Sequence, residues 1–153
     1  MLEIKKVTKI YKTEGFEQKA LDQVSVNFRK HEFASILGPS GSGKTTFLNI
    51  IGGLDQYTSG DLIINGKSTK QFKGRDWDSY RNKSIGFVFQ SFNLVPVLTV
   101  RENIVLPIQL DGGKVDERYV GEVVTALGLE KKLNSLPGQL SGGQQQRVAI
   151  ARA

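Results

Sequence analysis

The chain has 153 residues, of which 39% are hydrophobic and 24% are charged, and its formal net charge is +6. This composition is that of an ordinary globular protein and excludes disordered and fibrous classes, while the length suits one compact domain or one domain with two lobes. With no cysteine and a single histidine, the chain offers no disulfide, no thiolate metal site and no multi-histidine site. Any metal ion should therefore be a hard one such as magnesium.

The patterns of charge and hydropathy limit the cellular locations and the classes of partner that can be expected for this chain. The basic residues are dispersed without a block of five or six, so we do not expect nucleic acid as a partner. The N-terminus has no continuous apolar core of the kind found in a secretory signal, which predicts a cytoplasmic location. The longest uncharged run, residues 84–100, is shorter than the roughly 20 residues that cross a bilayer. We interpret it as a buried strand followed by a loop.

The first third of the chain predicts strands and then one helix. Residues 2–12 and 24–29 alternate apolar with polar side chains, as half-buried antiparallel strands do. Residues 33–37 form a short apolar run that predicts a strand. After a glycine-rich turn, a helix is expected from Lys44, and Gly52 with the following glycine should end it.

Further elements follow in chain order. Residues 61–67 contain an Asn-Gly pair, which predicts a hairpin turn, and residues 85–89 predict a further, buried strand that ends at Gln90. A helix is expected from about Asp116 to Gly128, and another after Ser141. The predicted apolar face of the first of these helices consists of Tyr119, Val120, Val123, Val124 and Leu127.

Residues 38–45 match the phosphate-binding pattern G-x-x-x-x-G-K-[ST] at every fixed position and lie between a predicted strand and a predicted helix. Glycines let consecutive N–H groups converge on phosphate oxygens, and the helix N-terminus adds partial positive charge. Lys44 would bridge the terminal phosphates and Thr45 would bind magnesium. The alternative is a glycine-rich turn that happens to precede a helix. The predicted nucleotide-binding residues here are Gly38, Pro39, Ser40, Gly41, Ser42, Gly43, Lys44, Thr45 and Thr46.

A second anion-binding helix start is predicted near the end of the sequence, where residues 140–153 read LSGGQQQRVAIARA. Ser141 is a good N-cap, the next two glycines leave the backbone amides open, and the helix dipole points outward. The alternative is an ordinary capped helix. At their spacing, the two motifs together resemble the ATP-binding subunits of ABC transporters, whose signature motif residues 140–153 match closely.

This resemblance covers the whole chain and implies an α/β fold. The expected architecture is a P-loop NTPase core with an incomplete parallel sheet, an N-terminal antiparallel β lobe and a helical subdomain. Residues 1–90 would form the nucleotide-binding lobe and residues 91–153 the helical subdomain. The resemblance also implies ATP and magnesium as cofactors, a second ATP-binding subunit that completes the site, and a transmembrane permease as partner on the cytoplasmic face of the membrane.

Several site residues are implied by the resemblance alone. Gln90 matches the family's glutamine that reaches magnesium and the attacking water. The catalytic candidates are therefore Lys44 and Gln90, and the candidate metal ligands are Thr45 and Gln90. The alternative is that Gln90 is only a polar residue that closes a strand. Tyr11 matches the aromatic residue that stacks on adenine, or it is an ordinary strand residue. The signature residues that would face the nucleotide of the opposite subunit are Ser141, Gly142, Gly143 and Gln144.

Two other features have weaker implications. Residues 92–96 with Leu98, Val100 and Asn103 resemble the groove that receives a helix of the membrane subunit, although core packing explains them equally well. His31 is the sole histidine, and we interpret it as a surface residue at a strand end. The family's switch histidine would follow the signature.

Residues 91–94 and 143–147 resemble the subgroup that exports antimicrobial peptides, macrolides and lipoproteins. In that family an apolar strand ending in Asp-Glu follows the signature and supplies the catalytic glutamate. Residues 104–111 are no substitute, because they precede the signature and contain Pro107, which disfavours a central strand. The chain as given therefore resembles a C-terminally truncated subunit that at most binds nucleotide. A soluble role in DNA repair would normally bring a coiled-coil insertion, which is absent here.

The family's strand order carries one further expectation. Residues 33–37 and 85–89 should run parallel but stand about 14 Å apart, because two later strands normally lie between them. Their unpaired edges should make the isolated chain prone to aggregation.

Overall fold

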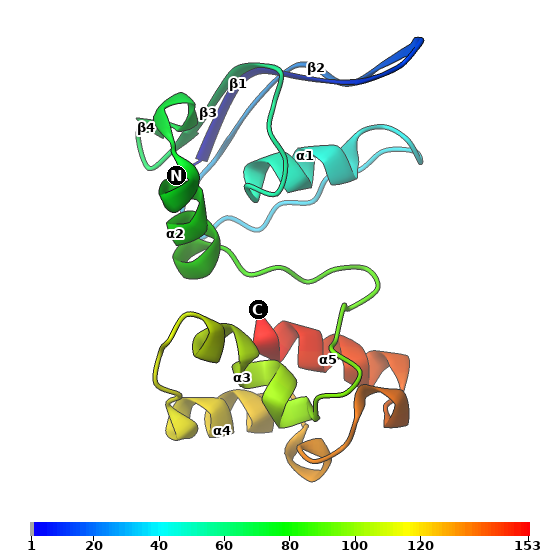
Figure 1. The fold of residues 1–153 in the computed structure, drawn as a ribbon, viewed down its shortest axis with the longest axis vertical. Helices are drawn as coiled ribbons and strands as arrows, with labels where there is room; N and C mark the ends of the chain where they lie inside the picture. Colours follow the sequence, from blue (N-terminus) through cyan, green and yellow to red (C-terminus); the bar gives the residue numbers. More distant parts are fainter. Residues whose placement is uncertain (1) are drawn as a thin grey trace. The chain divides into compact units, whose positions relative to one another are not determined.

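The computed structural model describes residues 2–153. The chain forms two compact units, Met1–Arg81 and Asn82–Ala153, which are described here one at a time (Figure 1). The first holds all four strands, whereas the second is built from helices and their connections. The functional division predicted at residue 90 stays a prediction.

The first unit is built on an antiparallel sheet with the strand order β2-β1-β3-β4. Its strands are β1 (Leu2–Thr13), β2 (Phe16–Phe28), β3 (Ser59–Ile64) and β4 (Lys67–Ser68). β1 is central, since Leu2 pairs with Phe28 on one side and Ile64 on the other. The predicted antiparallel opening is confirmed. β2 begins eight residues earlier than expected, because pairing with β1 extends it through a polar stretch.

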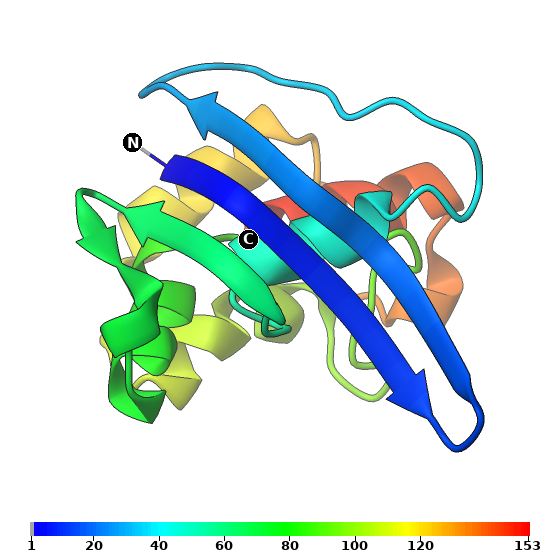
Figure 2. The same ribbon diagram turned by 90° about the horizontal axis from the view of Figure 1, so that it is seen from above.

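Helix α1 (Lys44–Ile51) lies against one face of this sheet (Figure 2). It begins after Gly43 and ends at Gly52, as predicted. Its buried residues Phe47 and Ile50 belong to a core that also contains Ile4, Val7 and Leu62 from the strands. The ring of Phe47 lies 6.3 Å from that of Phe28 in β2, measured between centroids. This packing fixes the start of α1 relative to the sheet.

The predicted hairpin is also confirmed, since β3 and β4 are joined by Asn65 and Gly66. Both have positive φ, 49° and 80°, as the type I′ turn requires. The chain then forms η1 (Thr69–Gln71) and α2 (Gly74–Ser84), which the sequence analysis did not predict. The hydroxyl of Tyr80 in α2 donates to the Ile51 carbonyl at 2.8 Å, and burial raises its pKa to about 12.

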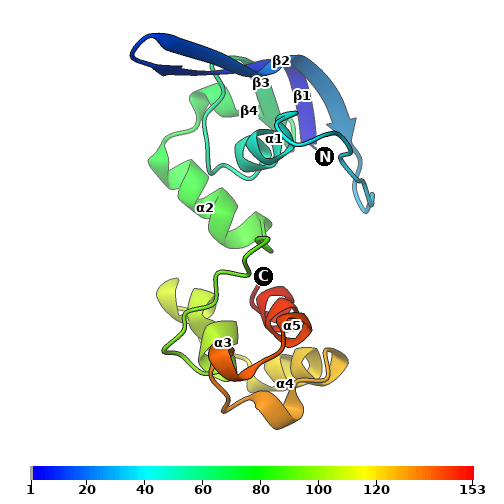
Figure 3. The same cartoon turned by 90° about the vertical axis from the view of Figure 1, so that its right-hand side faces the viewer.

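The second unit is a small helical bundle of α3 (Val100–Leu110), α4 (Glu117–Ala126) and α5 (Gly142–Arg152), with η2 (Glu130–Lys132) and η3 (Pro137–Gln139) between the last two (Figure 3). Each main helix begins at a side-chain cap, respectively Thr99, Asp116 and Ser141. The predicted starts at Asp116 and Ser141 are therefore confirmed. The bundle core consists of Val100, Ile104, Val105, Val120, Val124, Leu129, Leu140 and Val148.

The two predicted core strands are absent. Residues 33–37 and 85–89 lie outside every helix and strand of residues 2–153. Neither run is buried, since Leu37 is 88% exposed and Phe89 is exposed as well. A strand needs a neighbouring strand to complete its hydrogen bonds, and no described strand pairs with either segment. The prediction that these two segments are strands is therefore wrong for residues 2–153. Their parallel course and their 14 Å spacing stay untested, because the segments belong to different units.

The structure also tests the predicted apolar face of α4 and the predicted groove residues. Tyr119 is 62% exposed and does not join the buried face of α4, because the burial of Val120 and Val124 turns it toward solvent. Of the predicted groove residues, Val100 and Asn103 are fully buried in the bundle, so core packing accounts for them. His31 is exposed, as predicted. Within residues 2–153, no helix has the length and apolar character needed to cross a membrane.

Candidate functional site

The predicted phosphate-binding loop is shaped by its glycines. Gly41 and Gly43 have φ values of 79° and 83°, a left-handed region that side chains rarely adopt. Gly43 is also closely packed, because an added Cβ would lie 2.3 Å from the backbone carbonyl oxygen of Ala20 in β2. The loop therefore needs glycine at position 43 for both its backbone conformation and its contact with the sheet.

Lys44 begins α1 and folds back over this loop. Its ammonium group donates to the carbonyl oxygens of Gly38 at 2.9 Å and Pro39 at 2.7 Å. Thr45 is exposed in the same first turn, which contains no acidic residue. The N–H groups and dipole of the helix start are thus accompanied only by positive charge, an arrangement that favours an anion.

Tyr11 lies in the outer part of β1 and is held by a polar cluster. Its hydroxyl donates to Asp55 at 2.7 Å, and the Lys9 ammonium lies 4.7 Å from the centre of its ring. Lys9 also donates to Asp55 at 2.6 Å. Burial acts to raise the pKa of Asp55, but hydrogen bonds from Lys9, Tyr11 and the Gln56 N–H, with the charge on Lys9, lower it overall.

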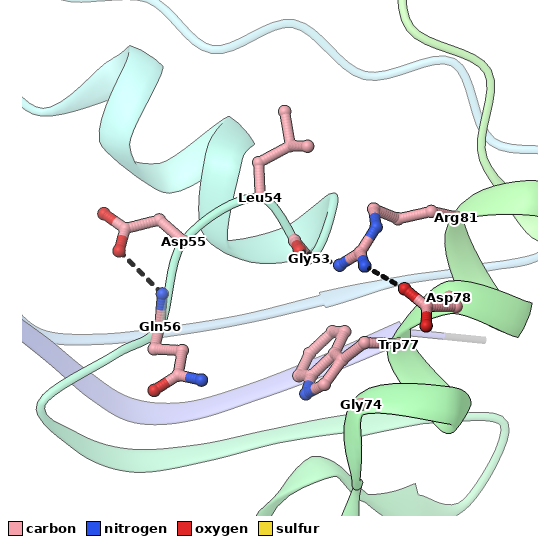
Figure 4. A pocket seen from close by; sticks show the side chains of 8 residues that line it. All are labelled: Gly53, Leu54, Asp55, Gln56, Gly74, Trp77, Asp78 and Arg81. Carbon is pink, nitrogen blue, oxygen red and sulfur yellow. Dashed lines mark hydrogen bonds and ion pairs between the residues drawn. The ribbon is translucent and has the colours of Figure 1, made fainter.

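Sequence reasoning missed Asp55, since an aspartate after a helix end matches no motif. It also lines a pocket of the first unit with residues of α2 (Figure 4). There Arg81 donates to the Gly53 carbonyl and to Asp78. None of the predicted site residues is in the pocket lining, which consists of Gly53, Leu54, Asp55, Gln56, Gly74, Trp77, Asp78 and Arg81.

The signature residues form a capped and open helix start in the second unit. Ser141 accepts a hydrogen bond from the Gln144 N–H at 3.3 Å, and Gln144 accepts one from the Ser141 N–H at 2.9 Å. No other group comes within 4 Å of a Cβ added to Gly142 or Gly143. The backbone at this helix start is therefore open to an approaching group, as the sequence predicts.

Gln90 lies in an exposed turn near the other end of α5. The Phe92 N–H closes this turn by donating to Phe89 at 3.0 Å. Arg152, the last residue of α5, donates to the carbonyl oxygens of Phe92 and Asn93, each at 2.7 Å, and burial lowers its pKa. The signature helix, about 16 Å long, thus spans from Ser141 to the Gln90 turn.

The predicted site residues therefore fall into two groups. Tyr11 and residues 38–46 belong to the first unit, whereas Gln90 and residues 141–144 belong to the second. Among residues 2–153, no group of three His, Cys, Asp or Glu side chains could hold a metal ion. Magnesium is often bound in proteins by one or two side chains together with substrate phosphates, and the exposed Thr45 hydroxyl fits that role. The individual roles stay predictions.

Comparisons with known proteins agree with the two motifs. The family described as ABC transporter matches residues 21–153. The ABC transporter ATP-binding protein YxdL of Bacillus subtilis is 46% identical over 155 residues, which include all of this chain and 60% of YxdL. A dimeric structure of MJ0796, a bacterial ABC transporter cassette by its description, superposes with a TM-score of 0.89 at 46% identity and covers 99% of this chain and 68% of that one.

A second MJ0796 structure, described as a post-hydrolysis state bound to ADP and Pi, superposes equally well. In sequence, MJ0796 of Methanocaldococcus jannaschii is 45% identical over 159 residues. The chain thus spans about 60% to 68% of the length of these relatives. Its antiparallel β lobe and helical bundle have the fold of part of a P-loop NTPase cassette. Since the family match covers both motifs and most of the sequence, the chain belongs to the ABC transporter family of ATP-binding proteins.

Proposed function

We propose that this chain binds Mg²⁺–ATP through residues 38–46, as part of an ATPase subunit that drives an ABC transporter. One observation carries the proposal. Gly43 packs against β2 and Lys44 lies over the loop at the start of α1, so backbone amides, helix dipole and ammonium converge on one place. Such a convergence suits the phosphates of a nucleoside triphosphate.

The signature helix supports an assembly in which two subunits share the nucleotides. Its start is capped by Ser141 and open at Gly142 and Gly143, which suits contact with the phosphates of a second copy. MJ0796, the similar cassette, has been solved as a dimer. In this proposal Gln90 acts beside magnesium, and a transmembrane permease binds on the cytoplasmic face of the membrane. Residues 91–94 and 143–147 support an export subgroup.

Residues 1–153 on their own should bind ATP without hydrolysing it efficiently. Phosphoryl transfer depends on groups that position the water and the metal, and the stretch from Ser141 to Ala153 contains neither aspartate nor glutamate. We expect turnover near background for these residues alone. Hydrolysis on the order of 1 per second or faster would place the catalytic base elsewhere in the chain.

The direct test is calorimetry of Mg²⁺–ATP binding to the parent and to Lys44→Ala. Loss of a charge-assisted contact should weaken binding by about 1.5–3 kcal/mol. Lys67→Ala is the matched control, because Lys67 is an exposed lysine of the same unit in β4, and it should bind ATP like the parent. Equal affinities of Lys44→Ala and the parent would remove the phosphate-loop assignment.

A further inference from the structure

A long-range polar contact in the first unit surrounds Tyr11. Asp55 is 44 residues away in sequence, in the segment that follows α1, and it accepts hydrogen bonds from both Tyr11 and Lys9. Lys9 donates a further bond to the Gln56 carbonyl at 2.7 Å. The contact therefore ties the outer part of β1 to the end of α1, the helix that carries Lys44.

Lys9 and Asp55 are less exposed to solvent than Tyr11. The side chains of Lys9 and Asp55 are 12% and 27% exposed, while Tyr11 as a whole residue is 40% exposed. The anchor is thus partly desolvated, whereas the ring that it holds remains accessible. Because Lys9 lies over one face of that ring, a planar ligand is directed to the other face.

We propose that Asp55, together with Lys9, is a positioning residue that fixes the Tyr11 ring for stacking on the base of the bound nucleotide. This inference rests on the proposed function, since it assumes that the phosphates lie at residues 38–46. Aromatic rings stack on any base without hydrogen-bond readout. Orientation of the ring therefore decides how much of that stacking is realised.

The charge of the cluster supports this role. The Asp55 carboxylate is ionised at neutral pH and accepts from the Tyr11 hydroxyl and the Lys9 ammonium at once, contacts that lower its pKa. Removing the carboxylate frees the hydroxyl and releases Lys9 from its place over the ring. Removing only the hydroxyl, as in Tyr11→Phe, leaves the ring without its anchor.

A purely structural role for Asp55 is distinguished by using two ligands. ATP carries a base, whereas inorganic tripolyphosphate has a similar phosphate chain without one. A change that only damages the fold weakens the binding of both. A change that disorients Tyr11 weakens ATP alone, and this difference is the quantity to measure by calorimetry in magnesium.

We expect Tyr11→Ala to weaken ATP binding about tenfold, and Asp55→Ala and Tyr11→Phe about threefold each, with tripolyphosphate binding unchanged. Adding Asp55→Ala to Tyr11→Phe should weaken ATP binding by less than about a further twofold, because both changes break the same contact. Asp61→Ala is the matched control, since Asp61 is a half-buried aspartate of the same unit that holds Ser68 instead. It should bind both ligands like the parent.

Three outcomes would overturn the inference, and they differ from failure of the proposed function. Asp55→Ala could bind ATP like the parent while Tyr11→Ala binds weakly, which would leave stacking intact without a positioning residue. Asp55→Ala could weaken ATP and tripolyphosphate equally, which would make its role structural. Tyr11→Ala could have no effect, which would remove the stacking itself. By contrast, tripolyphosphate binding that is absent or insensitive to Lys44→Ala would remove the proposed phosphate site.

Discussion

Gly43 at the start of α1 lies directly against Ala20 in β2, so closely that a Cβ on Gly43 would stand 2.3 Å from the Ala20 carbonyl oxygen. Gly41 has a similar φ, 79° against 83°, but no other group lies within 4 Å of its Cβ position. Substitutions at Gly41 and Gly43 should therefore cause similar backbone strain, whereas only a substitution at Gly43 also causes a steric clash.

Gly43→Ala should destabilise the first unit much more than Gly41→Ala. A side chain in the left-handed region costs about 1–2 kcal/mol at either position, and the forced contact with Ala20 adds roughly 1–3 kcal/mol at position 43 alone. Urea unfolding of both variants measures the difference. Equal losses of unfolding free energy would mean that β2 yields to the added methyl group.

Asn103→Ala should destabilise the second unit by roughly 2–4 kcal/mol, because it leaves several buried backbone groups without partners. The Asn103 amide accepts from the Val95 N–H at 2.8 Å and donates to the carbonyls of Val95, Leu98 and Thr99. Asn82→Ala is the control, since Asn82 is exposed and its side chain donates to the exposed Asp111. Its change should stay within about 0.5 kcal/mol. Thermal and urea unfolding measure both, and a loss at position 103 no larger than at position 82 would contradict the assignment.

The Asp55 anchor should contribute stability at neutral pH that disappears in acid. The folded-state pKa of Asp55 is lowered, so its contribution is fully present above the ordinary value of about 3.9 and is lost as the pH falls through the folded-state pKa. The titrating carboxylate faces the Lys9 ammonium and the Tyr11 hydroxyl. Parent and Asp55→Asn should therefore differ in unfolding free energy at about pH 7 and converge once the pH has fallen below the folded-state pKa of Asp55. A gap that stays constant over this range would show that charge plays no part.

The exposed apolar segment before the phosphate-binding loop should promote association of the 153-residue chain. Phe33 is 99% exposed and Leu37 is 88% exposed, in a stretch without a strand partner. Replacing both by lysine should slow aggregation in light scattering, because charges oppose edge-to-edge pairing. Leu110→Lys is the control, since Leu110 is equally apolar and 78% exposed at the end of α3, where the backbone is already hydrogen-bonded. An equal effect of both changes would point to general solubility instead.

Local patterns in the sequence determined many of the elements. The alternation in β1, the Asn65–Gly66 turn and the caps at Asp116 and Ser141 depend on a few neighbouring residues, so they could be predicted without knowledge of the remaining chain. The phosphate-binding loop and the signature also identified the family, because each motif is continuous in sequence. Helices α2 and α3 were missed, since α2 is largely polar and α3 contains Pro107.

Tertiary structure decided what depends on distant partners. Residues 33–37 and 85–89 have the apolar character of buried strands but form none, because a strand exists only with a hydrogen-bonding neighbour and none of the described strands pairs with them. Asp55 gives no local signal, and its role became visible only where the chain brings it against Lys9 and Tyr11. Secondary-structure propensity and motifs depend on neighbouring residues and can be recognised in the sequence. Strand pairing and polar contacts such as that of Asp55 depend on which distant segments come together in the fold.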